Sequence, residues 1–234
     1  MGRLIAALIR HADYQQLADT PSAHQPFALT ASGEAQARGA AHSLATTLDE
    51  RSWSLAPEID CSQLQRAWQT ARLIIDGLPN RLASNTALIE FAALAERSVG
   101  IAANLTLNQI EEVITGDPRY AAPPANWKSD SDYRLPLPGA ESLMEAGERV
   151  AAHIERRMRQ LARSPDVNTV KLFVGHGAAF RHAAFKLGVI DRPQIARLSM
   201  HHAVPIYLEY LDGAGWRHVG GEWKTRNQVA PLPE

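Results

Sequence analysis

The chain has 234 residues, of which 45% are hydrophobic and 21% are charged, as is ordinary for a globular protein long enough to bury a sizeable core. Its net charge of −1 excludes a global basic field that would attract nucleic acids or membrane surfaces. The first apolar run, 4–9, is shorter than the roughly 7–15 residues of a secretory signal, and no later run reaches the roughly 18 of a membrane span. The single cysteine, Cys61, allows no internal disulfide, which fits a reducing compartment. We therefore expect a cytoplasmic protein without nucleic-acid or membrane partners.

Short apolar runs alternate with helical periodicities through the first half of the chain. The predicted elements are, in order, a buried strand at 4–9, a polar loop at 14–29, a helix through 33–50 that Thr30 or Ser32 caps, a strand around Ile59 that ends at Cys61-Ser62, a helix at 64–75 and a strand at 86–91. This alternation indicates that parallel strands are connected by helices.

The second half begins with a segment of different character. Residues 104–140 contain five of the fourteen prolines and predict an irregular excursion that serves as a lid or binding loop. The elements predicted after it are a helix at 141–163, a strand at 170–174, a helix at about 178–187, a hairpin with Asp212-Gly213 near its turn, and a terminal segment, 227–234, without regular structure. Together they predict one α/β domain over 1–234. It is a three-layer sandwich with helices on both faces of a mostly parallel sheet and one antiparallel edge.

The residues that follow the predicted strands suggest what this fold binds, because ligands of such sheets lie beyond the carboxyl ends of the strands. These residues are Arg10 and His11 after the first strand, Arg66 beyond the strand at Cys61, and His176 with Gly177 after 170–174. Two guanidinium groups and a helix that begins at Gly177 offer donors to a tetrahedral oxyanion such as a phosphoryl group. A neutral imidazole among them can attack phosphorus and form a phosphohistidine. Arginines supply the stabilising charge, so no metal or cofactor is expected.

Five motifs carry a resemblance to a known family. They are, in chain order, "LIRHAD" (with Ala12 where a glycine is usual), "LTASGEAQA", "CSQLQRAWQTA", "PGAES" and "FVGHGAAFR". In this order the chain resembles the histidine phosphatase superfamily, whose members are similar to phosphoglycerate mutase.

The resemblance implies roles for matching residues. His11 would be the nucleophile, while Arg10, Arg66 and His176 would hold the phosphoryl oxygens. The segment "LAERSVG" resembles the part of the mutases that supplies the proton donor, which points to Glu96 as the donor and to Arg97 as a substrate contact. Glu90, which closes the predicted strand at 86–91, is the rival donor. Asp13, Tyr14 and Gly177 are predicted to lie beside the substrate, and Arg181 with His182 to be structural or peripheral.

Two departures from the mutase pattern bear on the reaction. Asp13 and Leu17 differ from the start of the mutase motif, and the lid-like segment carries a single arginine, Arg119, where mutases have paired basic residues. A mutase must grip a second acidic group, so we predict hydrolysis of a small-molecule phosphomonoester. A mutase-like phosphotransferase and a non-catalytic phosphate-binding sensor or scaffold remain alternatives. The sequence leaves the substrate's identity and the oligomeric state open, with a homodimer among the options.

Overall fold

The computed structural model describes residues 2–162 and 167–226; the predicted terminal segment 227–234 and Arg163, the predicted end of a helix, lie outside the described residues. The first strand, β1 (Leu4–Arg10), is buried on both faces. Ile5, Ala7 and Ile9 belong to one hydrophobic cluster and Leu4, Ala6 and Leu8 to another. Because successive side chains of a strand point to opposite faces, this apolar run requires cover on both sides.

The main sheet has seven strands and is mostly parallel, as predicted. Its strands, in spatial order, are β4 (Ala87–Phe91), β3 (Glu58–Ser62), β5 (Thr169–Gly175), β1, β7 (Pro205–Leu211) and β8 (Gly215–Gly220), with β2 (Ser54–Leu55) paired to β5. The strands from β4 to β1 are parallel, whereas β7 runs antiparallel to β1 and forms a hairpin with β8. Asp212 and Gly213 lie in the turn of this hairpin.

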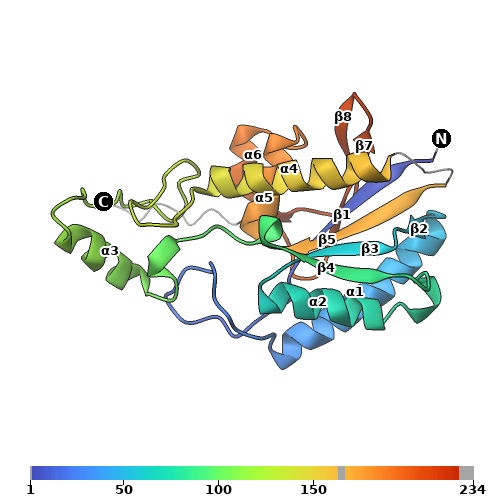
Figure 1. Ribbon diagram of the computed structural model, residues 1–234, viewed down its shortest axis with the longest axis horizontal. Helices are drawn as coiled ribbons and strands as arrows, with labels where there is room; N and C mark the ends of the chain where they lie inside the picture. Colours follow the sequence, from blue (N-terminus) through green and yellow to red (C-terminus); the bar gives the residue numbers. More distant parts are fainter. Residues whose placement is uncertain (1, 163–166, 227–234) are drawn as a thin grey trace.

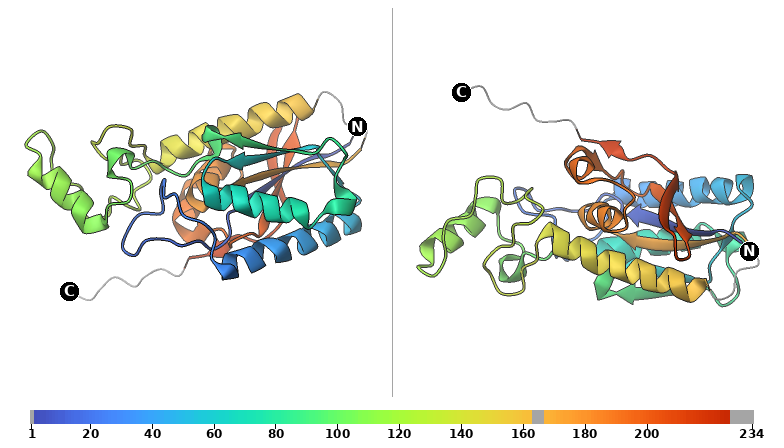
Figure 2. Two further views of the ribbon diagram at one scale, coloured as in Figure 1. Left: turned by 60° about the horizontal axis from the view of Figure 1, so that its bottom comes forward. Right: turned by 90° about the horizontal axis from the view of Figure 1, so that it is seen from above.

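Helices cover both faces of the sheet, which confirms the predicted layers (Figures 1 and 2). The two faces are covered by α1 (Ala31–Glu50) with α2 (Gln65–Asp76) and by α4 (Leu143–Leu161) with α5 (Gly177–Lys186). Thr30, not Ser32, caps α1, because its side chain accepts a hydrogen bond from the Gly33 amide. Ser142 and Glu145 form a capping box at the start of α4, so the "PGAES" motif fixes where that helix begins.

The segment 104–140 is more ordered than predicted. It contains α3 (Leu107–Gly116), whose first turn is fixed by a capping box of Thr106 and Gln109. It also has a hydrophobic cluster of its own around Trp127, Ile110 and Ile114, to which Ala23 of the loop 14–29 contributes. The expectation of an irregular excursion was therefore wrong for α3, since the prolines lie after that helix. Figure 1 shows that α3 projects beyond the carboxyl ends of the parallel strands.

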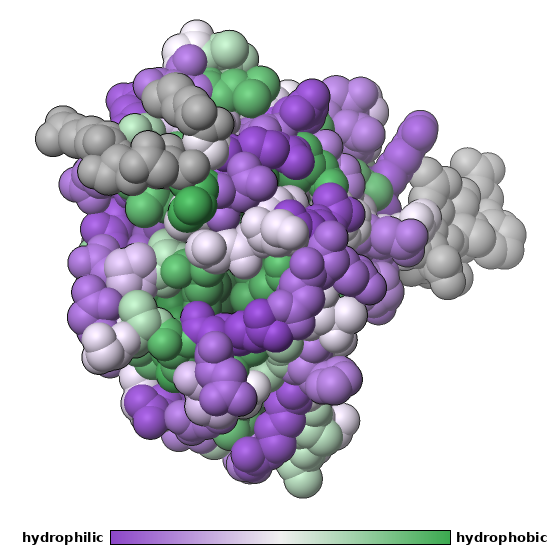
Figure 3. Space-filling model, turned by 90° about the vertical axis from the view of Figure 1, so that its right-hand side faces the viewer, coloured by the Kyte–Doolittle hydropathy of each residue, from purple (hydrophilic) through white to green (hydrophobic). Residues whose placement is uncertain are grey.

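The remaining elements are short. They are η1 (Pro79–Arg81), η2 (Ala92–Leu94), η3 (Gly100–Ala102), α6 (Arg192–Arg197) and a small antiparallel pair, β6 (Leu198–Ser199) with β9 (Lys224–Thr225). The end of the molecule that faces away from α3 is mainly hydrophilic, with small hydrophobic areas between the polar residues (Figure 3). Within 2–162 and 167–226, no helix combines the length and the apolar character needed to cross a membrane.

A buried charged cluster joins β3 and β5 to α4. The Asp60 carboxylate is fully buried and accepts hydrogen bonds from His153 Nε2 at 2.9 Å and Arg157 Nε at 2.8 Å. The ammonium group of Lys171, which is 3% exposed, lies 2.7 Å from the other oxygen of Asp60. Burial alone would raise the pKa of Asp60, but hydrogen bonds from His153 and Arg157 and the charge of Lys171 lower it to about 2. The cluster is therefore held together by an ionised aspartate.

Candidate active site

The last residue of β1 and the residue after it open the site. His11 is 1% exposed, and its Nδ1 lies 2.8 Å from the carbonyl oxygen of Ala12. A carbonyl oxygen only accepts, so Nδ1 carries the proton and the lone pair of Nε2 stays available. The Ala12 amide donates to Thr70 Oγ1 at 3.0 Å, and Ala12 is not among the residues with positive φ. The backbone therefore does not require the glycine that is usual in the family motif.

The surroundings of His11 keep its ring neutral. Burial lowers its pKa well below 6.5, and the charges of Arg66 and Arg10 lower it further. Arg10 lies against Gly177, and its Nη1 donates to the carbonyl oxygen of Met200 at 3.0 Å. Near pH 7 the site thus presents an unprotonated imidazole nitrogen beside a fixed guanidinium group.

Arg66 and His176 meet His11 from two other elements, α2 and the N-terminus of α5. The ring centroids of His11 and His176 are 5.1 Å apart. Arg66 Nη2 lies 3.3 Å from His176 Nδ1, which must accept, so His176 donates through Nε2 to Ser62 Oγ at 2.9 Å. Burial, followed by the charge of Arg66, lowers the pKa of His176 well below 6.5. The ends of β1, β3 and β5 therefore bring these side chains together at one edge of the sheet.

Arg66 also fixes the loop 14–29. Its Nη1 and Nη2 donate to the carbonyl oxygens of Gln25 and Ala23 at 2.9 and 2.8 Å, and its guanidinium group stacks on Tyr14 at 4.5 Å. Tyr14 is 6% exposed and meets His11 edge-on, with ring centroids 5.2 Å apart. It thus supports the site from behind and does not line the cavity described below.

The Asp13 side chain contacts Thr30, the residue that caps α1. Its carboxylate accepts a hydrogen bond from the Thr30 hydroxyl at 2.7 Å, and it is absent from the residues that line the cavity. Substrate contacts by Asp13 and by Tyr14 both stay predictions.

Glu96 lies at the N-terminus of α5, and its side chain is held by backbone amides. Oε1 accepts from Arg97 N at 2.9 Å and from Ala179 N at 3.1 Å, whereas Oε2 has only a long contact, 3.4 Å, from Ala178 N. Glu96 is 6% exposed and lines the cavity with Arg10 and His11. Glu90, the rival proton donor, is exposed on the edge strand β4 and does not line that cavity.

These residues border a cavity of about 410 Å³. Of the predicted residues, Arg10, His11, Glu96, Arg97 and Gly177 line it directly, while Arg66 and His176 are buried next to His11 and are not among the lining residues. The lining residues that sequence reasoning did not place there are Pro21, Ser22, Lys128, Ser129, Leu143, Ala178, Arg181, Ser199 and Arg226. Most of them come from loops and from the 104–140 segment, so no strand-end rule could have found them.

Two arginines need reinterpretation. Arg181, expected to be structural or peripheral, does donate to the carbonyl oxygen of Leu198 at 2.9 Å, but it also lines the cavity. Burial lowers its pKa to about 10, and its buried Nε has no hydrogen-bond partner among the described residues. Arg119, the single arginine of the predicted lid, pairs with Asp117 at 2.6 Å and does not line the cavity. The basic character of the cavity therefore comes from residues other than Arg119.

Gly177 lies close to the side chain of Arg10, and this close packing gives a testable prediction. A Cβ atom on residue 177 would lie 2.9 Å from Arg10 Cδ and 3.2 Å from Arg10 Nε. Because the Arg10 guanidinium is anchored on Met200, we expect Gly177→Ala to displace Arg10 and to lower kcat/KM for a phosphomonoester by about 10²-fold. The matched control is Gly39→Ala, since a Cβ there meets nothing within 4 Å. Equal activities of the two variants would contradict the role assigned to this contact.

His182 gives a prediction about pH. It is fully buried, with Nδ1 donating to Ala178 O at 2.7 Å and Nε2 accepting from the Ser131 hydroxyl at 3.0 Å. Burial lowers its pKa from 6.5 to about 4, so it stabilises the fold fully above pH 6.5 and loses that contribution as the pH falls toward 4. In this window, His182 contributes about 1.4 kcal/mol per pH unit to the slope of the unfolding free energy.

The measurement is urea unfolding at pH 6 and at pH 5 for the natural chain and for His182→Gln. We expect the glutamine variant to have the shallower dependence on pH, by about one proton. Identical slopes would mean that His182 does not stay neutral in the folded protein.

The described residues contain no evident metal site. In residues 2–162 and 167–226, no group of three or more His, Cys, Asp or Glu side chains is arranged to hold a metal ion. Cys61 is buried in β3, where burial raises the pKa of its thiol to about 12. It is therefore a core residue with no nucleophilic character near pH 7.

A comparison with protein families identifies the group to which the chain belongs. The family model described as "Histidine phosphatase superfamily (branch 1)" matches residues 6–220, which is most of the chain. The chain belongs to the histidine phosphatase superfamily. A curated relative, the 2,3-bisphosphoglycerate-dependent phosphoglycerate mutase of Parvibaculum lavamentivorans, is 28% identical over 154 residues, 66% of this chain and 67% of the relative. Membership makes a phosphatase or a mutase the expected kind of enzyme.

Solved structures agree on the fold of this histidine phosphatase family member. A phosphoglycerate mutase from Bacillus anthracis strain Sterne is 18% identical, with a TM-score of 0.68, covering 92% of this chain and 91% of that one. A mycobacterial glucosyl-3-phosphoglycerate phosphatase complexed with VO3 is 22% identical, with a TM-score of 0.62 and coverage of 97% and 98%. A putative α-ribazole-5′-P phosphatase from Escherichia coli K-12 is 20% identical, with a TM-score of 0.61 and the same coverage. At these identities the likeness establishes the α/β fold alone.

Proposed function

We propose that the protein hydrolyses phosphomonoesters through a phosphohistidine on His11, with Glu96 as the proton donor. The observation that carries the proposal is the state of His11, a neutral ring whose Nδ1–H is committed to Ala12 O, so that Nε2 is left as the nucleophile. The Arg10 side chain and the N-terminus of α5 border the same cavity. Both would attract the negative charge of a phosphoryl group.

The reaction has two balanced steps. First, His11 Nε2 attacks phosphorus while the ester P–O bond breaks, and the leaving oxygen takes a proton from Glu96. Then a water molecule attacks phosphorus, gives its proton to the Glu96 carboxylate and breaks the P–N bond, so that phosphate leaves and His11 is restored. Oε2 is the Glu96 oxygen suited to carry this proton, since Oε1 is already taken by two amides. Fixed positive charge and positioning supply most of the rate gain.

The charge of the cavity favours substrates with a second anionic group. Among the described residues, its lining includes five basic side chains, those of Arg10, Arg97, Lys128, Arg181 and Arg226, and one acidic side chain, that of Glu96. Arg97 and Arg181 are each largely buried, and burial lowers the pKa of both. A buried cation is costly unless an anion compensates it, so a carboxylate or a second phosphate on the substrate would fit here. The same observation keeps a mutase-like phosphotransferase as the second candidate.

The experiment uses the full chain with an excess of chelator and three phosphomonoesters: p-nitrophenyl phosphate, glycerol 3-phosphate and 3-phosphoglycerate. We expect release of inorganic phosphate, a phosphoryl group on His11 after an alkaline quench, and a higher kcat/KM for 3-phosphoglycerate than for glycerol 3-phosphate. Transfer between glycerate positions without release of phosphate would establish the phosphotransferase instead. Binding of phosphate without any turnover would leave the sensor or scaffold.

A further inference from the structure

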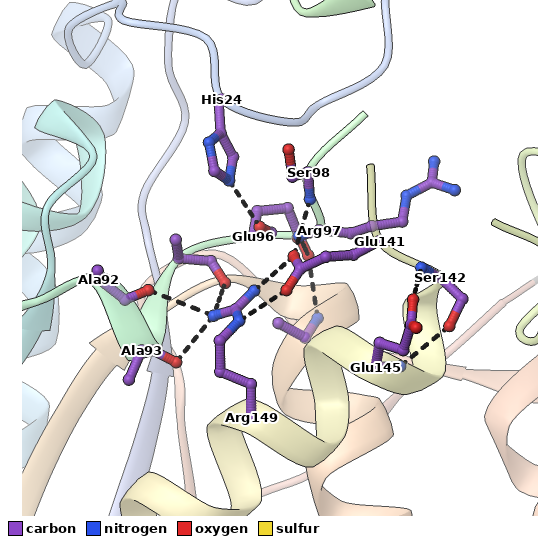
Figure 4. A network of polar contacts seen from close by, with 12 residues as sticks. His24, Ala92, Ala93, Glu96, Arg97, Ser98, Glu141, Ser142, Glu145 and Arg149 are labelled. Carbon is purple, nitrogen blue, oxygen red and sulfur yellow. Dashed lines mark hydrogen bonds and ion pairs between the residues drawn. The ribbon is translucent and has the colours of Figure 1, made fainter. Parts of the chain in front are cut away.

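The strand β4 and the helix η2 lead into the segment that carries Glu96, and one arginine of α4 holds that segment. Arg149 Nη1 donates to three backbone carbonyl oxygens, those of Ala92, Ala93 and Ala95, at 3.3, 2.9 and 3.2 Å (Figure 4). Ala92 and Ala93 belong to η2 and Ala95 follows it, and the Ala92 carbonyl oxygen also accepts from the Ala95 amide at 3.0 Å. We propose that Arg149 is a positioning residue for the reaction, setting where the Glu96 carboxylate lies. The inference rests on the proposed role of Glu96 as proton donor.

Glu141 completes the arrangement and fixes the arginine. Arg149 Nε and Nη2 donate to the two carboxylate oxygens of Glu141 at 2.9 and 2.8 Å, a bidentate pair that sets the plane of the guanidinium group. Glu141 also accepts from Ser98 N at 3.1 Å, and its own amide donates to Ser98 O at 2.8 Å. The Arg149–Glu141 pair therefore hydrogen-bonds to the backbone on both sides of Glu96, at 92–95 and at Ser98. Hydrogen bonds of the pair lower the pKa of Glu141, although burial opposes this.

Among the described residues, neither Arg149 nor Glu141 hydrogen-bonds to the Glu96 carboxylate, the protein group that exchanges the proton. Neither Arg149 nor Glu141 lines the cavity, and among the residues that the structure describes the side-chain hydrogen bonds of Arg149 are to backbone carbonyls and Glu141. A lysine could supply charge here, but it has no planar fork to reach the carboxylate and the carbonyls at once. Any effect of Arg149 on the reaction is therefore indirect and passes through the segment that carries Glu96 and Arg97.

The leaving group provides a readout that a merely structural role would not move. p-Nitrophenolate is a good leaving group and departs without a proton. The alkoxide of glycerol is a poor leaving group and must be protonated as it departs. We expect Arg149→Met to lower kcat/KM, which reports the steps up to cleavage of the ester bond, by about 10²-fold on glycerol 3-phosphate and by less than about threefold on p-nitrophenyl phosphate. Glu141→Gln should give the same selectivity with a smaller loss. Arg149→Lys should lie between the natural chain and the methionine variant.

The controls separate position from stability. Arg159→Met is the matched substitution on the same helix, because Arg159 is exposed, contacts Glu155 and Tyr210, and does not line the cavity, and it should leave kcat/KM on both esters unchanged. The double variant Arg149→Met with Glu96→Gln should be no slower on glycerol 3-phosphate than Glu96→Gln alone, since both changes remove one function. If Arg149→Met does not fold, Arg149→Lys and Glu141→Gln decide the question by the same ratio of rates.

The failures of the two proposals look different. If Glu96→Gln lowers kcat/KM equally for both esters, Glu96 is not the donor of the proton to the leaving oxygen and the proposed function fails in that part. If Glu96→Gln is selective for the poor leaving group but Arg149→Met, Arg149→Lys and Glu141→Gln are not, the positioning role is overturned while the function stands. Additive losses in the double variant would also overturn it.

Discussion

His11→Ala is expected to abolish turnover of p-nitrophenyl phosphate, with kcat falling by about 10⁴–10⁶-fold, because the substitution removes the only atom placed to bond to phosphorus in the proposed mechanism. The remaining cationic groups would still bind the ester, so KM should change far less than kcat. The measurement is steady-state hydrolysis with chelator present. It is combined with a mass measurement of the alkaline-quenched protein, in which the phosphoryl adduct of the natural chain should be missing from the variant.

The control for this prediction is His218→Ala. His218 is exposed on β8, away from the carboxyl ends of the parallel strands, and its removal should leave both measurements unchanged. Thermal unfolding establishes that His11→Ala is folded, and His11→Asn, which keeps a polar side chain in the buried position, serves as a second loss-of-nucleophile variant. Residual hydrolysis within tenfold of the natural rate would rule out His11 as the nucleophile.

Asp60→Ala is expected to lower the free energy of unfolding by about 3–5 kcal/mol, the largest effect on stability that we predict. The substitution leaves the buried ammonium group of Lys171 and the guanidinium group of Arg157 without their shared carboxylate. Because the folded-state pKa of Asp60 lies near 2 and its ordinary value near 3.8, this stabilisation is fully present above pH 3.8 and is lost as the pH falls toward 2. Urea unfolding at pH 7 measures the difference.

Two comparisons make this test specific. Asp76→Ala removes one half of an exposed pair with Arg72 on α2 and should cost less than about 1 kcal/mol. The double variant Asp60→Ala with Lys171→Met replaces the unpaired cation by an apolar side chain and should recover part of the loss. A cost for Asp60→Ala no larger than that for Asp76→Ala would contradict the burial and pairing described for the cluster.

The elements that could be predicted were those whose pattern depends on neighbours in sequence. An apolar run such as 4–9 identifies a strand covered on both faces, and the rule for carboxyl ends predicts from sequence alone that His11, Arg66 and His176 lie at one edge of the sheet. Family motifs supplied Glu96. The helix α3 was also readable in principle, because Thr106 and Gln109 have the spacing of a capping box, but the prolines that follow it obscured the pattern.

The features that were missed depend on how distant segments pack. The residues near Asp60 in the sequence do not predict its ion pairs with Lys171 and Arg157. These two partners are distant in sequence, because they lie on β5 and α4. Lys128 likewise enters the cavity through the path of the 104–140 segment, and Arg181 enters it from the buried side of α5. The positive charge of the site is therefore greater than the single arginine of the predicted lid indicated.

Ala23 gives the loop 14–29 an unexpected place in the molecule. Its methyl group belongs to the hydrophobic cluster of the 104–140 segment, while its carbonyl oxygen accepts the 2.8 Å hydrogen bond from Arg66. The 104–140 segment is thereby connected, through Ala23, to the buried guanidinium group of Arg66. A change in the packing of that segment would therefore reach Arg66 as well as the residues that line the cavity.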